Sequence, residues 1–166
     1  NAYKTAGLSA NEYMETVTSF SASLLQSLNG DTAKSAQVAD MAITDMSDNA
    51  NKMGTDMTMI QNAYQGFAKQ NYTMLDNLKL GYGGTKEEMQ RLLLDAQKIT
   101  GIKYDISNLN DVYQAIHVIQ GELGITGTTA KEASTTIQGS IASMKSAWQN
   151  MLTGIATGNS ENIGNL

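Results

Sequence analysis

A glycine-rich loop with hydroxyl and amino groups is the first candidate for chemistry in this sequence. It runs from Gly81 to Lys86 as Gly-Tyr-Gly-Gly-Thr-Lys. A phosphate-binding loop sets its glycines, lysine and hydroxyl residue in a fixed order between a strand and a helix, so that backbone amides converge on the anion. The loop here meets neither the P-loop nor the dinucleotide spacing, and a helical pattern precedes it. We therefore expect a hinge between helices at Gly81, Gly83 and Gly84, and no nucleotide site.

A second candidate, residues 105–111, has oxygen-bearing side chains at alternating positions, as a calcium loop has. A calcium loop of the EF-hand kind needs an oxygen ligand at its fifth position and glycine at its sixth. Leu109 and Asn110 occupy these positions. Because Ser107 and Asn108 are good helix N-caps, the pattern predicts the start of a helix and no metal site.

The remaining candidates are one histidine and a pair of acidic residues. His117, the only histidine, lies off the apolar arc of its predicted helix, and a metal site needs more ligands than it and scattered carboxylates supply. Asp45 and Asp48 are about one helical turn apart, but an acid–base pair needs a desolvated pocket. Their polar neighbours predict a solvated face instead. We therefore expect no catalytic, cofactor-binding or metal-binding residue, and no enzyme.

The composition narrows the classes further. The chain has no cysteine, which excludes a disulfide scaffold, a thiolate zinc site and a cysteine nucleophile. Its formal net charge of −5 does not suit binding along phosphates, so we expect no sequence-specific nucleic-acid partner. The longest apolar run is Leu92 to Leu94, so we expect no membrane span in this segment. The chain begins at Asn1, and we expect it to be part of a longer protein.

The elements that must position these residues are helices. The chain has no proline, and apolar residues recur at spacings of three and four almost throughout. This periodicity predicts an all-α fold, a bundle of about six helices. In the N-terminal part the expected helices cover residues 10–28, 32–53, 56–68, 72–80, 86–100 and 108–123.

Capping residues support several of these boundaries. Asp31 and Thr85 are suitable N-caps, and Glu88, three residues after Thr85, would complete a capping box. Gly54 and Gly101 follow apolar-periodic stretches and should end those helices, and Asn29 with Gly30 should end the first helix in the left-handed conformation.

A long amphipathic helix is expected at the C-terminal end. It should cover residues 128–158 and pack on the bundle or on partners, after a compact bundle over residues 1–127 and before a disordered tail over residues 159–166. Few charges interrupt this stretch, and a nearly uncharged helix with one apolar stripe is typical of packing against a partner. The expected interaction surface, here called the C-terminal seam, comprises Ile137, Ile141, Met144, Trp148, Leu152 and Ile155.

Four stretches of sequence, together and in order, carry a family resemblance. They run from Gly7 to Leu25, from Ala36 to Met46, from Met53 to Tyr72 and from Met74 to Lys86, and the likeness is densest between residues 36 and 94. In these stretches the chain resembles phage tail tape-measure proteins, also described as phage-related minor tail proteins. It is similar to an excised segment of such a chain encoded by a prophage.

The resemblance implies a structural and assembly role. Tape-measure proteins are long helical chains that lie in the lumen of the virion tail, set tail length and act in genome ejection, and they occupy the host cytoplasm during assembly. The implied partners are other copies of the chain, the tail tube protein and tail assembly chaperones. An alternative is a helical secreted effector or sensor-type coil that oligomerises through the C-terminal seam.

Overall fold

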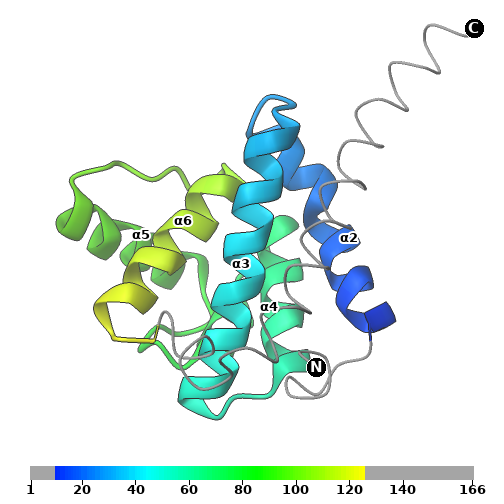
Figure 1. Ribbon diagram of the computed structural model, residues 1–166. Helices are drawn as coiled ribbons and strands as arrows, with labels where there is room; N and C mark the ends of the chain where they lie inside the picture. The colour runs from blue at the N-terminus through cyan, green and yellow to red at the C-terminus, as the bar shows by residue number, and fades with distance from the viewer. Residues whose placement is uncertain (1–9, 126–166) are drawn as a thin grey trace, which may run out of the picture.

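The computed structural model describes residues 10–125, and in this part of the chain every regular element is helical (Figure 1). The all-α prediction is therefore confirmed for these residues. The elements are α2 (Ala10–Ser27), α3 (Thr32–Met53), α4 (Met57–Ala68), the 3₁₀ helix η1 (Leu75–Leu78), α5 (Lys86–Thr100) and α6 (Leu109–Glu122). The predicted C-terminal helix, the C-terminal seam from Ile137 to Ile155 and the tail lie outside the described residues.

Side-chain caps and left-handed residues set the helix ends, largely where the sequence predicts them. The Asp31 carboxylate accepts from the Lys34 amide at 3.0 Å at the start of α3, and Gly54, at φ 65°, ends that helix. Asn108 caps α6 by accepting from the Asp111 amide at 3.0 Å. These caps satisfy amides that have no partner within the helix, which fixes where each helix begins.

The segment before the glycine-rich loop differs from the prediction. A helix was expected over residues 72–80, but only the single 3₁₀ turn η1 forms there. The Asn71 side chain accepts from both the amide and the hydroxyl of Thr73, and such local bonds compete with a helical start. The 3₁₀ turn then places Leu75 and Leu78, three residues apart, on one side, where both are fully buried.

Helix α3, the longest helix in residues 10–125, packs against three others. It packs against α2 and α4 on one side and against α6 on the other, and α6 in turn packs against α5 (Figure 1). Because three helices surround α3, its buried surface is wider than a single apolar stripe. Its buried residues are Ser35, Ala36, Val38, Ala39, Ala42, Ile43, Asp45, Met46, Asp48 and Asn49.

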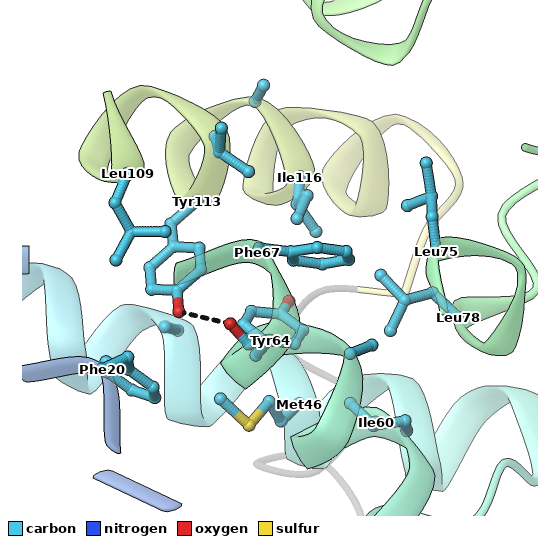
Figure 2. Close-up of a cluster of buried hydrophobic side chains, with 14 of the residues drawn as sticks. Phe20, Met46, Ile60, Tyr64, Phe67, Leu75, Leu78, Leu109, Tyr113 and Ile116 are labelled. Carbon is cyan, nitrogen blue, oxygen red and sulfur yellow. Dashed lines mark hydrogen bonds between the residues drawn. The ribbon is translucent and has the colours of Figure 1, made fainter. Parts of the chain in front are cut away.

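Aromatic side chains join three of the helices in the core (Figure 2). The rings of Phe20 and Tyr113 meet edge to face at a centroid distance of 5.3 Å, and those of Tyr64 and Tyr113 lie 5.2 Å apart. The Tyr113 hydroxyl donates to the Tyr64 carbonyl at 3.0 Å. These contacts tie α2, α4 and α6 together, and such aromatic pairs add to the stabilisation from burial.

Candidate functional site

The main candidate site is a group of buried polar side chains between α3 and α6, here called the polar cluster. It comprises Asp45, Asp48 and Asn49 from α3 and His117 and Gln120 from α6. The prediction that Asp45 and Asp48 lie on a solvated face is wrong, because the two residues are only 1% and 0% exposed. Their neighbours in sequence are polar, but α6 packs on α3 here, and His117 and Gln120 contact Asp45.

The charged contact of the cluster joins Asp45 to His117. The Nδ1 atom of His117 lies 3.0 Å from each carboxylate oxygen of Asp45. The Asp45 side chain is 1% exposed, whereas that of His117 is 38% exposed. The histidine therefore lies at the rim of the bundle, as its position off the apolar arc suggested, while its partner is in the interior.

Burial and pairing shift both pKa values upward. Burial raises the pKa of Asp45 above its usual value, and the hydrogen bond from His117 offsets this only in part. The same hydrogen bond raises the pKa of His117, and burial of the ring opposes that shift. The protonated imidazole is therefore favoured beside Asp45, because it supplies a positive charge to a carboxylate that has lost its water.

Neutral hydrogen bonds complete the cluster. The Asn49 amide donates at 2.9 Å both to the Leu78 carbonyl and to the side-chain oxygen of Gln120, and it accepts from Thr55 at 2.8 Å. Gln120 in turn donates to the Asp45 carbonyl at 3.1 Å. Asn49 and Gln120 are 0% exposed, so these bonds satisfy groups that would otherwise be costly to bury.

The cluster has half of the arrangement that nucleophilic catalysis requires. A carboxylate that orients an imidazole activates a hydroxyl or thiol only when that nucleophile lies at the second ring nitrogen. Within residues 10–125, the hydrogen bonds of the His117 ring run through Nδ1 to Asp45. In the same part of the chain, no group of three or more acidic, histidine or cysteine side chains could hold a metal ion. The contact between Asp45 and His117 therefore attaches α6 to α3, and the charge of this contact depends on whether His117 is protonated.

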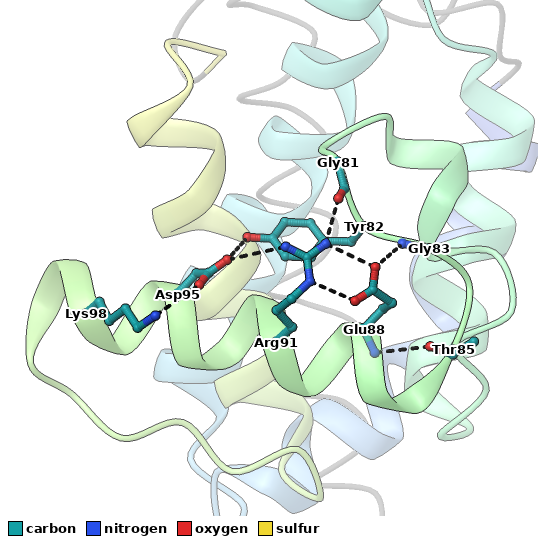
Figure 3. A network of polar contacts seen from close by, with 8 residues as sticks. All are labelled: Gly81, Tyr82, Gly83, Thr85, Glu88, Arg91, Asp95 and Lys98. Atoms are coloured by element: carbon teal, nitrogen blue, oxygen red, sulfur yellow. Dashed lines mark hydrogen bonds and ion pairs between the residues drawn. The ribbon is translucent and has the colours of Figure 1, made fainter.

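The predicted hinge forms a second polar site, here called the joint network (Figure 3). The Arg91 guanidinium donates to the Gly81 carbonyl at 2.7 Å and to the Glu88 carboxylate at 2.7 Å, and it lies 4.2 Å from the centre of the Tyr82 ring. Tyr82 donates to Asp95 at 2.5 Å. The first turns of α5 are thereby fastened to the loop that precedes the helix.

The capping box at α5 is present only in part. The Thr85 hydroxyl accepts from the Glu88 amide at 3.1 Å, as predicted. The Glu88 carboxylate, however, accepts from the Gly83 amide at 3.0 Å and pairs with Arg91. The hydrogen bonds from Arg91 and from the Gly83 amide lower the pKa of Glu88 to about 2. An internal carboxylate therefore takes the amide that a phosphate would need, which disfavours anion binding in this loop.

The three predicted hinge glycines have different structural roles. Gly81 has φ 94°, in the left-handed region that favours glycine. Gly84 lies so close to the Thr73 carbonyl that a Cβ atom there would be 2.2 Å from the Thr73 oxygen, whereas a Cβ at Gly83 would be in ordinary contact with Glu88. Motion at this joint stays a prediction, and it would require the joint network to open.

Comparisons with protein-family models, with curated proteins and with solved structures found no match to the chain.

None of the helices in residues 10–125 is both long and apolar enough to cross a membrane. Fold and site define residues 10–125 as a helical bundle with an apolar core and a polar cluster buried between α3 and α6.

Proposed function

We propose that the chain is a structural and assembly segment of a phage tail tape-measure protein, which sets tail length and acts in genome ejection. The observation that carries the proposal is the order of the four stretches between Gly7 and Lys86 that resemble this family. The helical fold of residues 10–125 suits a family of long helical chains. The role is mechanical, and we propose no reaction for it.

A length-setting role requires the bundle to open or to associate inside the tail. A helix rises about 1.5 Å per residue, so 166 residues in one extended helix would span about 250 Å. The longest described helix, α3, has 22 residues and spans only about 33 Å. The described form is thus a local bundle, which we propose precedes or alternates with an extended form.

The nature of the helix contacts supports such opening. Part of the α3 surface is made of small residues, including Ala36, Ala39 and Ala42, which bury little apolar area each. On the α6 side, the polar cluster replaces apolar contacts with groups that water can solvate when the helices separate. Exposing such a surface costs less than exposing large apolar side chains, because apolar area contributes about 25 cal/mol per Å².

The proposed helices, partners and locations of the chain follow from the same role. We propose about six helices in all, with a long amphipathic helix over residues 128–158 that uses the C-terminal seam against the bundle or against partners. The proposed partners are other copies of the chain, the tail tube protein and tail assembly chaperones. The proposed locations are the lumen of the virion tail and, during assembly, the host cytoplasm.

Mass spectrometry of purified phage particles tests the location. Peptides from residues 10–125 should be present in intact tails at a fixed ratio to the tube protein. They should be lost from the tails after genome ejection is triggered, because a chain in the lumen must leave before DNA can pass. The tube protein, which stays in the particle, is the internal control. Absence of these peptides from intact particles, with the chain found in a secreted fraction, would favour the secreted coil instead.

A further inference from the structure

We propose that the contact between Asp45 and His117 is a pH-sensitive switch, which holds α6 against α3 at mildly acidic pH and weakens as the pH rises. The proposal goes beyond the tape-measure role, because it concerns the folded chain wherever that chain acts. It rests on the geometry of the polar cluster, where a fully buried carboxylate meets a half-exposed imidazole at 3.0 Å.

The asymmetry of burial makes the contact responsive to pH. Asp45 is in the interior and His117 is at the rim, so solvent protons reach the histidine while the carboxylate stays desolvated. With the ring protonated, Nδ1 donates a charge-assisted hydrogen bond to Asp45. With the ring neutral, Nδ1 still donates, but the buried carboxylate loses the positive charge that compensates it.

The surrounding titratable groups strengthen this dependence. Asp48, also on α3 and fully buried, contributes to the raised pKa of His117. Tyr64 from α4 and Tyr113 from α6 are buried phenols with raised pKa values, so they stay neutral near neutral pH. Four of the six charged side chains of α5 pair with one another in or beside the joint network, namely Glu88, Arg91, Asp95 and Lys98. The other two, Lys86 and Glu87, are exposed. On α2, Glu15 is exposed. Protonated His117 is thus the cation in contact with the buried Asp45 carboxylate.

The direction of the effect follows from the pKa shifts. The pKa of His117 is raised above 6.5 in the folded chain, so its stabilisation is complete below pH 6.5 and is lost as the pH rises through the folded value. The pKa of Asp45 is also raised, and a raised carboxyl pKa likewise makes the folded state less stable as the pH increases. The two groups act in the same direction. Rising pH therefore loosens the attachment of α6.

Titration of the wild-type chain by NMR is the direct test. His117 is the only histidine, so a single imidazole Cε1–H signal reports its pKa in the folded 166-residue chain. We expect a value above 6.5, and a decrease toward 6.5 in the Asp45→Asn variant. The Asp76→Asn variant removes an exposed carboxylate and should leave the value unchanged. A wild-type pKa at or below 6.5 would overturn the proposal, whatever the variants do.

Stability and exchange measurements test the consequence for α6. In denaturant titrations, the folding equilibrium constant of the wild type should fall tenfold for each unit by which the folded pKa of His117 exceeds its unfolded value. The His117→Gln variant, which keeps a side-chain donor, should show no such fall above about pH 6.5. Amides of α6 should lose more protection over the same pH range than those of α2 and α4, after correction for intrinsic exchange. An equal pH dependence in wild type and His117→Gln would overturn the proposal.

Discussion

Replacing Gly84 by alanine should lower the free energy of unfolding by about 3 kcal/mol, the upper part of the usual range for overpacking. A Cβ atom at this position would lie 2.2 Å from the Thr73 carbonyl oxygen and 2.9 Å from its carbon. Both are backbone atoms, so no side chain can rotate to make room. Relief requires the loop before α5 to move away from the segment that contains Thr73. The shift in the midpoint of urea denaturation, with an unchanged slope, measures the effect.

Gly83→Ala is the matched control for this substitution. The new Cβ atom would lie 3.5 Å from the Cγ atom of Glu88, which is an ordinary contact, and the Gly83 amide can still donate to the Glu88 carboxylate. We expect stability to be unchanged or to rise by about 0.5 kcal/mol, because alanine restricts the unfolded chain more than glycine does. Equal effects of the two substitutions would show that general flexibility of the loop, and not close approach at Gly84, explains the glycines.

Replacing Asn49 by alanine should also cost about 3 kcal/mol, because it removes three hydrogen bonds, two of them fully buried, and leaves a small cavity. The Leu78 carbonyl and the Gln120 side-chain oxygen would each lose the donor that now lies 2.9 Å away. Thr55 would lose its acceptor. The effect should be seen in chemical denaturation and as faster exchange of amides in η1 and α6, which Asn49 ties to α3.

The control for Asn49 is available on the same helix. Asn51 is exposed in the last turns of α3, so Asn51→Ala should change stability by less than about 0.5 kcal/mol. If Asn49→Ala were as mild as Asn51→Ala, the polar cluster would contribute little to holding the helices together.

The helix ends could be predicted from sequence because they depend on local chemistry. Asp31, Thr85 and Asn108 cap their helices through amides three residues ahead, and Gly54 and Gly101 adopt the left-handed conformation that few other residues accept. Each of these choices involves only residues near in sequence. The prediction of a helix over residues 72–80 was wrong, because burial of Leu75 and Leu78 and the local hydrogen bonds of Asn71 outweighed the helical pattern.

The polar cluster could not be predicted in the same way. Asp45 and His117 are 72 residues apart in sequence. Taken alone, α3 and α6 each have a polar stripe that could face solvent as well as another helix. The sequence contained only a weak indication that these residues meet. Asp45, Asp48 and Asn49 share a face of α3, and His117 and Gln120 share a face of α6, so two polar faces of matching spacing could have been paired. The sequence does not indicate which helix packs on which face of α3. The polar face is buried because α6 packs on α3 in addition to α2 and α4.

The joint before α5 is a mixed case. The glycines and the cap at Thr85 were found from sequence, but the reason for Gly84 is a close approach to Thr73, which only the packed structure reveals. Glu88 was assigned to the cap and instead binds the Gly83 amide and Arg91. These contacts add a requirement to the predicted hinge, since its motion must break the joint network.

Tail length in particles with an altered parent gene tests the central claim most directly. An in-frame duplication of the 166-residue segment should lengthen the tails by about 250 Å, and its deletion should shorten them by a similar amount, if the chain is extended as helix in the tail. Electron micrographs of negatively stained particles give the length, with tail width as the internal control. The account predicts a change in proportion to the residues added or removed. Intact particles with tails of unchanged length would contradict it.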